Sequence, residues 1–405
     1  METTQRQSYL DWLRIFSIAG VLFFHSAMPY AAHLGWHIKN QETSTLLFLS
    51  NIGMHLVRMP LLFFISGTVS YYMMQRRSAF SFIGLRFTRL LIPLLAGMLL
   101  IVPPQIYMER LTQGYTGTYL DFYKTVFQFK MYPKGNFSWH HLWFIAYLFI
   151  YDLVFAPVFM YMISDKSRRL KQAIGKLGNN KLVFLLAVPS VLWFTFICQG
   201  REQMPDLLHD GAGFVYWLLF VLAGFICILV PSLMESLQRN RRISIAVGFA
   251  GMVLFYYFVL NSNGNDAANI SENPGLLFRI ALKPIIAWAW VFGLIGYGKK
   301  YLNRPHKSLH YLNQAVYPFY ILHQTVIVVL VYYITQFNTD TVITKYIYTV
   351  FITFFISMAL FHFFIKPYPA IRFLFGMKPS ATLKKEVKKQ IAGVAEDKKL
   401  TQSIA

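Results

Sequence analysis

The chain has 405 residues, of which 56% are hydrophobic and 18% aromatic, while only 14% are charged. Soluble domains carry about one quarter charged residues, so this composition excludes an ordinary soluble enzyme, and its hydrophobicity excludes a disordered chain. The net charge of +21 indicates cytoplasmic loops beside anionic lipids, so membrane lipids are expected partners and nucleic acid is not. Cys198 and Cys227 both lie in apolar runs, which excludes a disulfide framework and a cysteine zinc site.

Apolar stretches long enough to cross about 30 Å of hydrocarbon recur along the chain. They predict an all-α integral membrane protein with ten transmembrane helices in a single membrane domain, residues 1–376, followed by a charged and flexible tail, residues 377–405. The expected helices are, in chain order, 10–30, 46–74, 82–103, 142–163, 182–198, 214–234, 243–261, 276–295, 311–335 and 341–365.

The basic residues of the connecting loops are distributed asymmetrically. If the N-terminus is cytoplasmic, the inner loops hold 17 Lys and Arg residues and the tail holds seven, whereas the outer loops hold six. By the positive-inside rule both termini are therefore expected in the cytoplasm, in a multi-pass protein of the cell inner membrane. The longest outer loop, residues 104–139, is expected to close over an external substrate.

The first helix carries ionisable residues at membrane depth, where they are costly and therefore candidates for function. Asp11 and Arg14 are three residues apart and can pair on one face. His25 follows Arg14 by eleven residues, about three turns or roughly 16 Å, so both side chains point the same way. His25 is a candidate general base for acyl transfer to an alcohol. The alternative is that Arg14 reaches the inner headgroups and His25 is a packing histidine.

The second helix places His55 and Arg58 three residues apart, with Arg58 about twelve residues into the span. A guanidinium so deep should face a cavity, an anionic ligand or a carboxylate partner. The structural alternative is an ion pair, for which Asp152 is the only acidic residue we can nominate in the later spans. Ser66 beside Gly67 favours a small-residue packing patch over a nucleophile, because the sequence shows no base beside it.

Arg86 and Arg89 open the third helix on the cytoplasmic side. In isolation they indicate positive-inside anchoring, and the alternative is a clamp for the phosphates of a cytosolic cofactor. His140, His141 and Trp143 open the fourth helix at the outer interface, where aromatic residues form a belt. Adjacent helical side chains differ by about 100° in direction, so we expect no metal shared by the two histidines and no metal site elsewhere.

His323 lies about a dozen residues into the ninth helix, again at membrane depth. A histidine hydrogen-bonded across helices explains any one of these residues. Three deep histidines and a deep arginine together favour a functional polar path.

Several motifs occur in an order that resembles the membrane acyltransferases of family 3, over about residues 8 to 379. They are YLDWLR with Arg14 ten residues before His25, FFISG at 63–67, RFTRLLIP at 86–93, HLWF at 141–144 and YPFYILH at 317–323. GWH at 35–37, HLVRM at 55–59 and RFLFGMKP at 372–379 are similar to the glucan-biosynthesis branch, which is associated with succinyl decoration of periplasmic glucans.

The resemblance implies an acyl-CoA donor on the cytoplasmic side, an acceptor hydroxyl on a periplasmic or envelope glycan, and no permanently bound cofactor. Arg14 and His25 match positions held to be essential in the family, with His25 as the base and Arg14 orienting the donor. Within the given sequence we expect no fused hydrolase-like domain of the kind that some relatives carry. The remaining expected contacts are Arg58, Ser66, Arg86 and Arg89 to the donor, and His55, His141, Trp143 and His323 to the substrate.

The leading hypothesis is therefore an O-acyltransferase that moves a short acyl group, acetyl or succinyl, onto an envelope glycan. Its first rival is a transporter or flippase without covalent chemistry, since buried polar residues among ten helices also describe carriers. A structural or sensor protein is the third possibility. The sequence leaves open the acyl group, the acceptor, the oligomeric state and whether a covalent acyl-enzyme forms.

Overall fold

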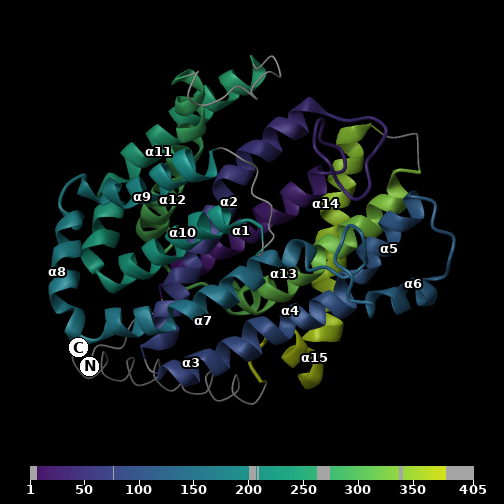
Figure 1. Ribbon diagram of the computed structural model, residues 1–405, viewed down its shortest axis with the longest axis horizontal. Coiled ribbons are helices and arrows are strands. Elements are labelled where there is room, and N and C mark those ends of the chain that lie inside the picture. The colour runs from purple at the N-terminus through teal and green to yellow at the C-terminus, as the bar shows by residue number, and fades with distance from the viewer. Residues whose placement is uncertain are drawn as a thin grey trace, which may run out of the picture.

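In the computed structural model the protein is a bundle of long helices (Figure 1). The structure describes residues 7–75, 77–199, 207, 209–261, 274–336 and 341–379. This part of the chain contains helices and turns and no β-strand, as the composition predicted. Most of the tail, from residue 380 onward, lies outside the described residues.

Nine helices in the described ranges are long and apolar enough to cross a membrane, or ten if one bent pair counts as a span. The chain is therefore a multi-pass membrane protein, and the predicted count of ten is confirmed only if that pair crosses. The nine are α1 (Ser8–Ala27), α2 (Thr45–Met74), the run α3 to α5 (Ala79–Thr112), α7 with its first turn (His140–Ile163), α10 (Gly211–Leu229), α11 (Pro231–Leu260), α12 (Pro274–Tyr301), α13 (Lys307–Ile334) and α14 with its last turn (Val342–Ile365).

The predicted fifth helix, 182–198, is not a straight span. It consists of a 3-10 segment (Leu182–Ala187), the short helix α9 (Val188–Leu192) and a π-helical segment (Trp193–Cys198). Together these bend by 116° from the preceding segment, which contains α8 (Arg168–Gly175). Pro189 stands in the first turn of α9, where its missing N–H is tolerated, so the helix restarts there instead of continuing.

The predicted end of the helix 214–234 and the predicted start of the helix 243–261 are both wrong, because a proline starts the second helix earlier than hydropathy indicates. The expected helix 214–234 runs across a break, since α10 ends at Leu229 and Pro231 begins α11. Arg239, Arg241 and Arg242, which are among the 17 basic residues counted above for the inner loops, consequently lie within α11. Pro fits the first helical position because its fixed φ is already helical and its absent N–H needs no partner there.

The third span is continuous but irregular. It comprises α3 (Ala79–Arg86), α4 (Ile92–Ala96) and α5 (Pro103–Thr112), joined by π-helical turns at Phe87–Leu91 and Gly97–Ile101. Such turns mark a locally relaxed helix and are frequent at functional sites. The span extends past the predicted end at 103, so part of the expected loop 104–139 is helical, as α5 and as α6 (Tyr119–Val126).

Helix α1 crosses the middle of the bundle, against α2, α12, α13 and α14. Helices α2 and α10 approach unusually closely at Gly67 and Gly224. A β-carbon on Gly67 would collide with the carbonyl of Val221, and one on Gly224 with the carbonyl of Phe64. The small-residue packing patch predicted beside Ser66 is therefore confirmed.

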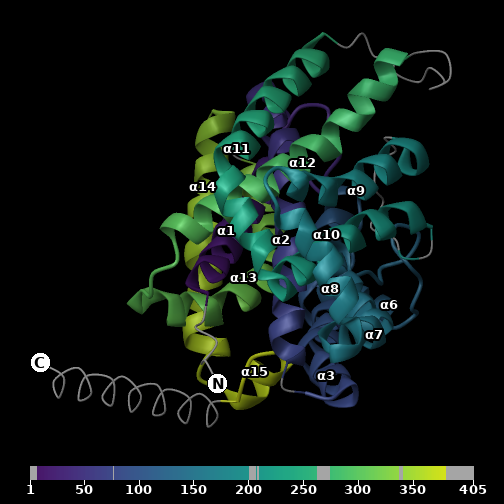
Figure 2. The same cartoon turned by 90° about the vertical axis from the view of Figure 1, so that its left-hand side faces the viewer.

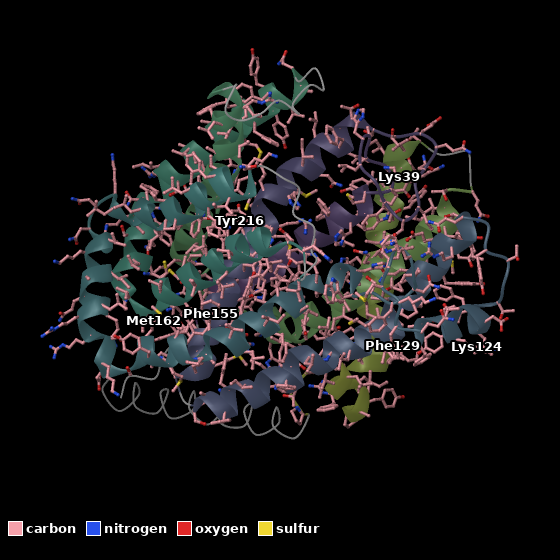
Figure 3. All side chains as sticks on the ribbon, viewed as in Figure 1. Lys39, Lys124, Phe129, Phe155, Met162 and Tyr216 are labelled. Atoms are coloured by element: carbon pink, nitrogen blue, oxygen red, sulfur yellow. The ribbon has the colours of Figure 1, made fainter. Side chains whose placement is uncertain are left out.

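The two ends of the molecule differ in the segments they carry. Helices α3 and α15 (Pro369–Leu374) lie at the bottom of both ribbon views (Figures 1 and 2). Helices α5 and α6 lie to the right in Figure 1, and Lys39, Lys124 and Phe129 appear on that same side in Figure 3. Lys39 and Lys124 belong to segments between the predicted spans that the charge distribution assigns to the outer side.

Candidate functional site

The polar residues of α1 both bond to α13. Arg14 donates from Nη2 to Asn313 Oδ1 at 2.5 Å and to Asp11 Oδ1 at 3.4 Å. Near the other end of α1, His25 Nδ1 lies 2.8 Å from His323 Nε2, with the two rings stacked. The shared face predicted from the spacing of Arg14 and His25 is thus observed, and so is the Asp11–Arg14 pair.

The hydrogen bonds of His323 determine which nitrogen of His25 can act as a base. His323 Nδ1 lies 2.6 Å from the Tyr320 carbonyl, which can only accept, so Nδ1 carries the proton. In a neutral imidazole the other nitrogen is an acceptor, so His323 Nε2 accepts from His25 Nδ1. His25 Nε2 then holds its lone pair, and it has no hydrogen-bond partner among the described residues.

His141 and Trp143 are more constrained than the sequence indicates. His141 is buried, its Nε2 donates to the Ile321 carbonyl at 3.0 Å, and its Nδ1 lies 3.5 Å from Gln105 Nε2. Both ring nitrogens are thus engaged, and the ring packs edge-on against His323. Trp143 packs in an aromatic cluster with Phe63, Tyr147 and Trp217. His141 therefore supports His323 directly, whereas Trp143 belongs to the neighbouring aromatic cluster.

Arg58 does not form the ion pair considered from the sequence. Its guanidinium stacks on the Phe24 ring at 3.6 Å, and its Nε is buried without a hydrogen-bond partner in the part of the chain that the structure describes. Phe24 in turn packs edge-on against His25, with the ring centres 5.2 Å apart. His55 on α2 is exposed, and its ring centre lies 6.1 Å from that of Phe24 on α1. Arg58 is thus a buried cation beside the histidine pair.

Asp152 instead pairs with Arg86. Arg86 Nε lies 2.7 Å from Asp152 Oδ2, and Ser70 Oγ accepts from Arg86 and donates to Asp152, each at 2.7 Å. All three residues are buried. Arg86 was expected to anchor the helix at the membrane surface or, from the family resemblance, to contact the donor; the Asp152 carboxylate largely neutralises its charge.

One cavity of about 720 Å³ opens between α1, α2, the α3–α5 run and α13. Its charged and polar wall holds Arg14, Arg86, Arg89, His310, Asn313, Gln314, Arg372 and Lys378. Its apolar wall includes Ile18, Leu62, Ile65, Val69, Phe144, Leu148 and Val316. No acidic side chain is among these described lining residues, so the cavity has the character of an anion site with an apolar interior.

The ends of two segments complete the cavity wall. Arg89 donates to the Gly376 carbonyl at 3.0 Å, and Arg372 donates to the carbonyls of Lys366 and Lys378. Burial lowers the pKa of Arg372, but a guanidinium remains charged near neutral pH. Ser66 also faces the cavity, with its hydroxyl bonded to the Leu62 carbonyl.

Tyr320 separates the cavity from the histidine pair. It lines the cavity, its hydroxyl donates to the His141 carbonyl, and its ring centre lies 5.8 Å from that of His323. His25 is partly exposed yet is not among the cavity-lining residues. The cavity therefore reaches the layer of residues next to His25 without including His25 itself.

The sequence analysis missed the partners that hold these residues. Asn313 and Gln105 carry amide side chains, so a search for ionisable groups could not find them, and Tyr320 stood only within the YPFYILH motif without a role. Arg372 and Lys378 were found only within the RFLFGMKP motif and were given no role. The spacing from Arg14 to Asn313 and from His25 to His323 is about 300 residues, which no local pattern can reveal.

Comparison with known proteins agrees with the resemblance. Residues 7–362 match the acyltransferase domain family. Curated relatives named glucans biosynthesis protein C, from Escherichia coli O1:K1 and from Shigella dysenteriae serotype 1, are 24% identical over 397 residues. The same protein of Escherichia coli K12 is 23% identical. Each alignment covers 93% of this chain and 95% of the relative. No solved structure gives a significant match.

Proposed function

The chain belongs to the acyltransferase family that it matches from residue 7 to 362, and from that premise we propose that it transfers an acetyl or succinyl group from acyl-CoA to a hydroxyl of an envelope glycan. The chain is an acyltransferase of the membrane. The transporter hypothesis loses its support, because the matched family is one of acyltransferases, whereas a carrier moves its substrate without covalent chemistry. The donor, the acceptor and the inner-membrane location are the parts of this proposal that need experiments.

The basic cavity supports an acyl-CoA donor. Arg14, Arg89 and Lys378 supply cations for the phosphates, and guanidinium forks match phosphate geometry. The apolar interior suits the pantetheine arm, and Tyr320 ends the cavity beside His323. With the cytoplasmic termini expected from the loop charges, the mouth near Arg372 and Lys378 opens toward cytosolic acyl-CoA.

The histidine pair supports direct transfer. The acceptor hydroxyl gives its proton to His25 Nε2 while its oxygen attacks the thioester carbonyl. The tetrahedral intermediate then expels the CoA sulfur, which takes the proton back from His25. One ester bond forms, one thioester bond breaks and one thiol is released. His323 holds His25 in the required tautomer, as its bond to the Tyr320 carbonyl implies.

Arg58 is placed for one of two roles in this reaction. An unpaired buried cation beside the reacting histidine would stabilise the oxyanion of the intermediate. It would also attract the free carboxylate of a succinyl chain. Wild type and Arg58→Leu, assayed with acetyl-CoA and succinyl-CoA, separate these roles. Loss with both donors indicates oxyanion stabilisation, and selective loss with succinyl-CoA indicates recognition of the dicarboxylic chain.

A glycan acceptor rests on the relatives, whose printed name is glucans biosynthesis protein C. Partial exposure of His25 away from the cavity would let the acceptor approach from the outer side, past His55 and Trp36. The ring of Trp36 stacks on that of His25 at 5.6 Å, and aromatic faces are suited to sugar rings.

The test is mass spectrometry of envelope glycans from cells with wild type, His25→Ala, or no gene, at matched protein levels. An ester mass that appears only with wild type is expected, and its size names the acyl group. His362→Ala is the control, because His362 is exposed and outside the site. Identical glycans in all strains would overturn the glycan acceptor, and thioester consumption by purified protein would then show whether transfer itself stands.

A further inference from the structure

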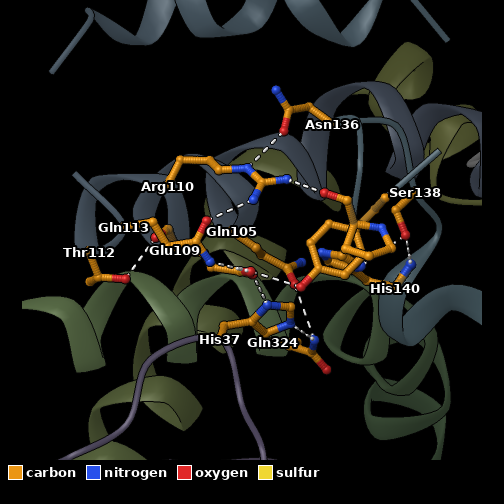
Figure 4. Close-up of polar contacts among 12 residues, drawn as sticks. His37, Gln105, Glu109, Arg110, Thr112, Gln113, Asn136, Ser138, His140 and Gln324 are labelled. Atoms are coloured by element: carbon orange, nitrogen blue, oxygen red, sulfur yellow. Dashed lines mark hydrogen bonds and ion pairs between the residues drawn. The ribbon is translucent and has the colours of Figure 1, made fainter. Parts of the chain in front are cut away.

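A second group of ionisable side chains lies outside the histidine pair and the cavity. His37 comes from the loop between α1 and α2, Glu109 from α5, and His140 from the turn that begins the α7 span. One ligand atom from each lies within 4.8 Å of the others. Figure 4 shows the three side chains converging from these separate segments. From the sequence we expected no metal site, neither at the adjacent pair His140 and His141 nor elsewhere; the structure directs those two side chains to different neighbours.

The contacts within the group leave one ligand atom unused. His37 Nδ1 meets Glu109 Oε2 in a close contact, and Glu109 is 4% exposed. His140 Nε2 is buried and has no hydrogen-bond partner among the described residues. Its ring centre is 4.7 Å from that of His37. A buried imidazole nitrogen without a partner loses its hydrogen bonds to water, and no protein hydrogen bond offsets that cost in free energy. A ligand in the space that the nitrogen faces would offset it.

The surrounding residues orient the three side chains. Ser138 Oγ lies 2.9 Å from His140 Nδ1, which can place the lone pair on His140 Nε2. Tyr132 donates its hydroxyl to Glu109 Oε1 at 2.8 Å, leaving Oε2 directed at the group. Metal-binding histidines and carboxylates are characteristically held by such outer hydrogen bonds.

The nearest cation is already engaged by other acceptors. Arg110 donates to Asn136 Oδ1, to Gln113 Oε1 and to the carbonyls of Pro133 and Gly135 (Figure 4). No ion pair joins it to Glu109 in the described part of the chain. The negative charge of Glu109 is thus directed to the side of the two histidines.

We propose that His37, Glu109 and His140 bind a divalent transition-metal ion of the zinc type at the outer end of the bundle. Two imidazoles and one carboxylate are a ligand set that zinc accepts, with a fourth position left for water. Tetrahedral zinc holds its ligand atoms about 3.4 Å apart, so on binding the close His37–Glu109 contact opens while His140 moves toward the ion. The ion ties the loop bearing His37 to α5 and α7.

This site is distinct from the acyl-transfer site and does not depend on the proposed function. Neutral side chains connect the proposed metal site to the acyl-transfer site. His37 Nε2 lies 3.4 Å from Gln324 Nε2, and Gln324 adjoins His323 and donates to Gln105 at 3.2 Å. The ion therefore fixes the outer layer beside the histidine pair without contacting the reacting groups.

The test uses full-length protein purified in detergent through a tag without histidine, stripped with a chelator and then titrated with zinc. We expect about one zinc per chain after desalting, and a higher melting temperature with zinc. Cobalt in place of zinc should give the visible absorption of a tetrahedral ion. His140→Asn should lose the bound metal and the melting shift.

The matched control is His33→Asn. His33 and His140 both have positive φ, 59° and 40°, which asparagine tolerates, but His33 is exposed and outside the group. We expect His33→Asn to bind zinc as wild type does. Glu109→Gln, a second variant of nearly equal volume, should weaken binding at least tenfold. Wild-type protein without stoichiometric zinc, or zinc retained by His140→Asn, would overturn the site.

Discussion

The two ends of the α1–α13 contact use polar residues in opposite ways. At the cavity end, Arg14 meets Asn313 beside an open space of about 720 Å³ lined by further cations. At the other end, His25 meets His323 in a layer where nearly every nitrogen has a defined partner. An open basic cavity suits binding of a large anion, whereas a closed hydrogen-bonded layer suits control of one proton. Binding and chemistry should therefore be separable by mutation.

A sharper contrast exists between two arginines of the same span. Both line the cavity, but Arg86 is buried in an ion pair with the Asp152 carboxylate, whereas Arg89 donates to the Gly376 carbonyl. Arg86→Leu leaves the Asp152 carboxylate buried and unpaired, so we expect a loss of about 3–5 kcal/mol in stability. The double variant Arg86→Met with Asp152→Leu should recover most of it, because apolar residues can replace a buried pair.

Thermal denaturation in detergent measures both variants against wild type. If Arg86→Leu were as stable as wild type but bound acyl-CoA poorly, Arg86 would belong with the ligand cations and the contrast with Arg89 would fail.

The histidine layer predicts a graded response at His323. His323→Leu removes the acceptor for His25 Nδ1 and should lower the transfer rate by about 10- to 100-fold, the value of a hydrogen bond in such a site. His323→Gln places an amide oxygen near the position of Nε2 and should retain more activity than leucine does. The KM for acyl-CoA should not change in either variant. Equal losses for both would contradict the tautomer argument.

The smallest effect is expected at the cavity mouth. Lys378 is exposed and lines the cavity, so Lys378→Gln should raise the KM for acyl-CoA only about two- to threefold, and less at high salt. Lys307→Gln, an exposed lysine that does not line the cavity, should leave it unchanged. A salt-independent effect would argue against a phosphate contact.

Much of this architecture was predictable because a bilayer constrains each span separately. Hydropathy found nearly all spans, and the spacing of Arg14 and His25 gave their common face. The errors occurred where helices begin at prolines, at Pro189 and Pro231, since hydropathy does not detect a restart.

The partners of the candidate residues were not predictable. Arg58 and Arg86 are both deep arginines, and only the three-dimensional packing shows that Asp152 neutralises Arg86. Likewise His37, Glu109 and His140 come from three segments whose loop or helical state the sequence left open or misassigned. Pairing across distant segments is a property of the bundle, which a single sequence does not display.

The most direct measurement is equilibrium binding of an acyl-CoA thioester to purified wild type, His25→Ala and Arg14→Gln, followed by transfer from the bound complex. The account predicts that His25→Ala binds with an unchanged Kd but transfers at least about 100-fold more slowly, the contribution of a general base. Arg14→Gln should raise the Kd by about tenfold, as loss of a charged hydrogen bond would. Normal transfer by His25→Ala, or a Kd unaffected in Arg14→Gln, would contradict it.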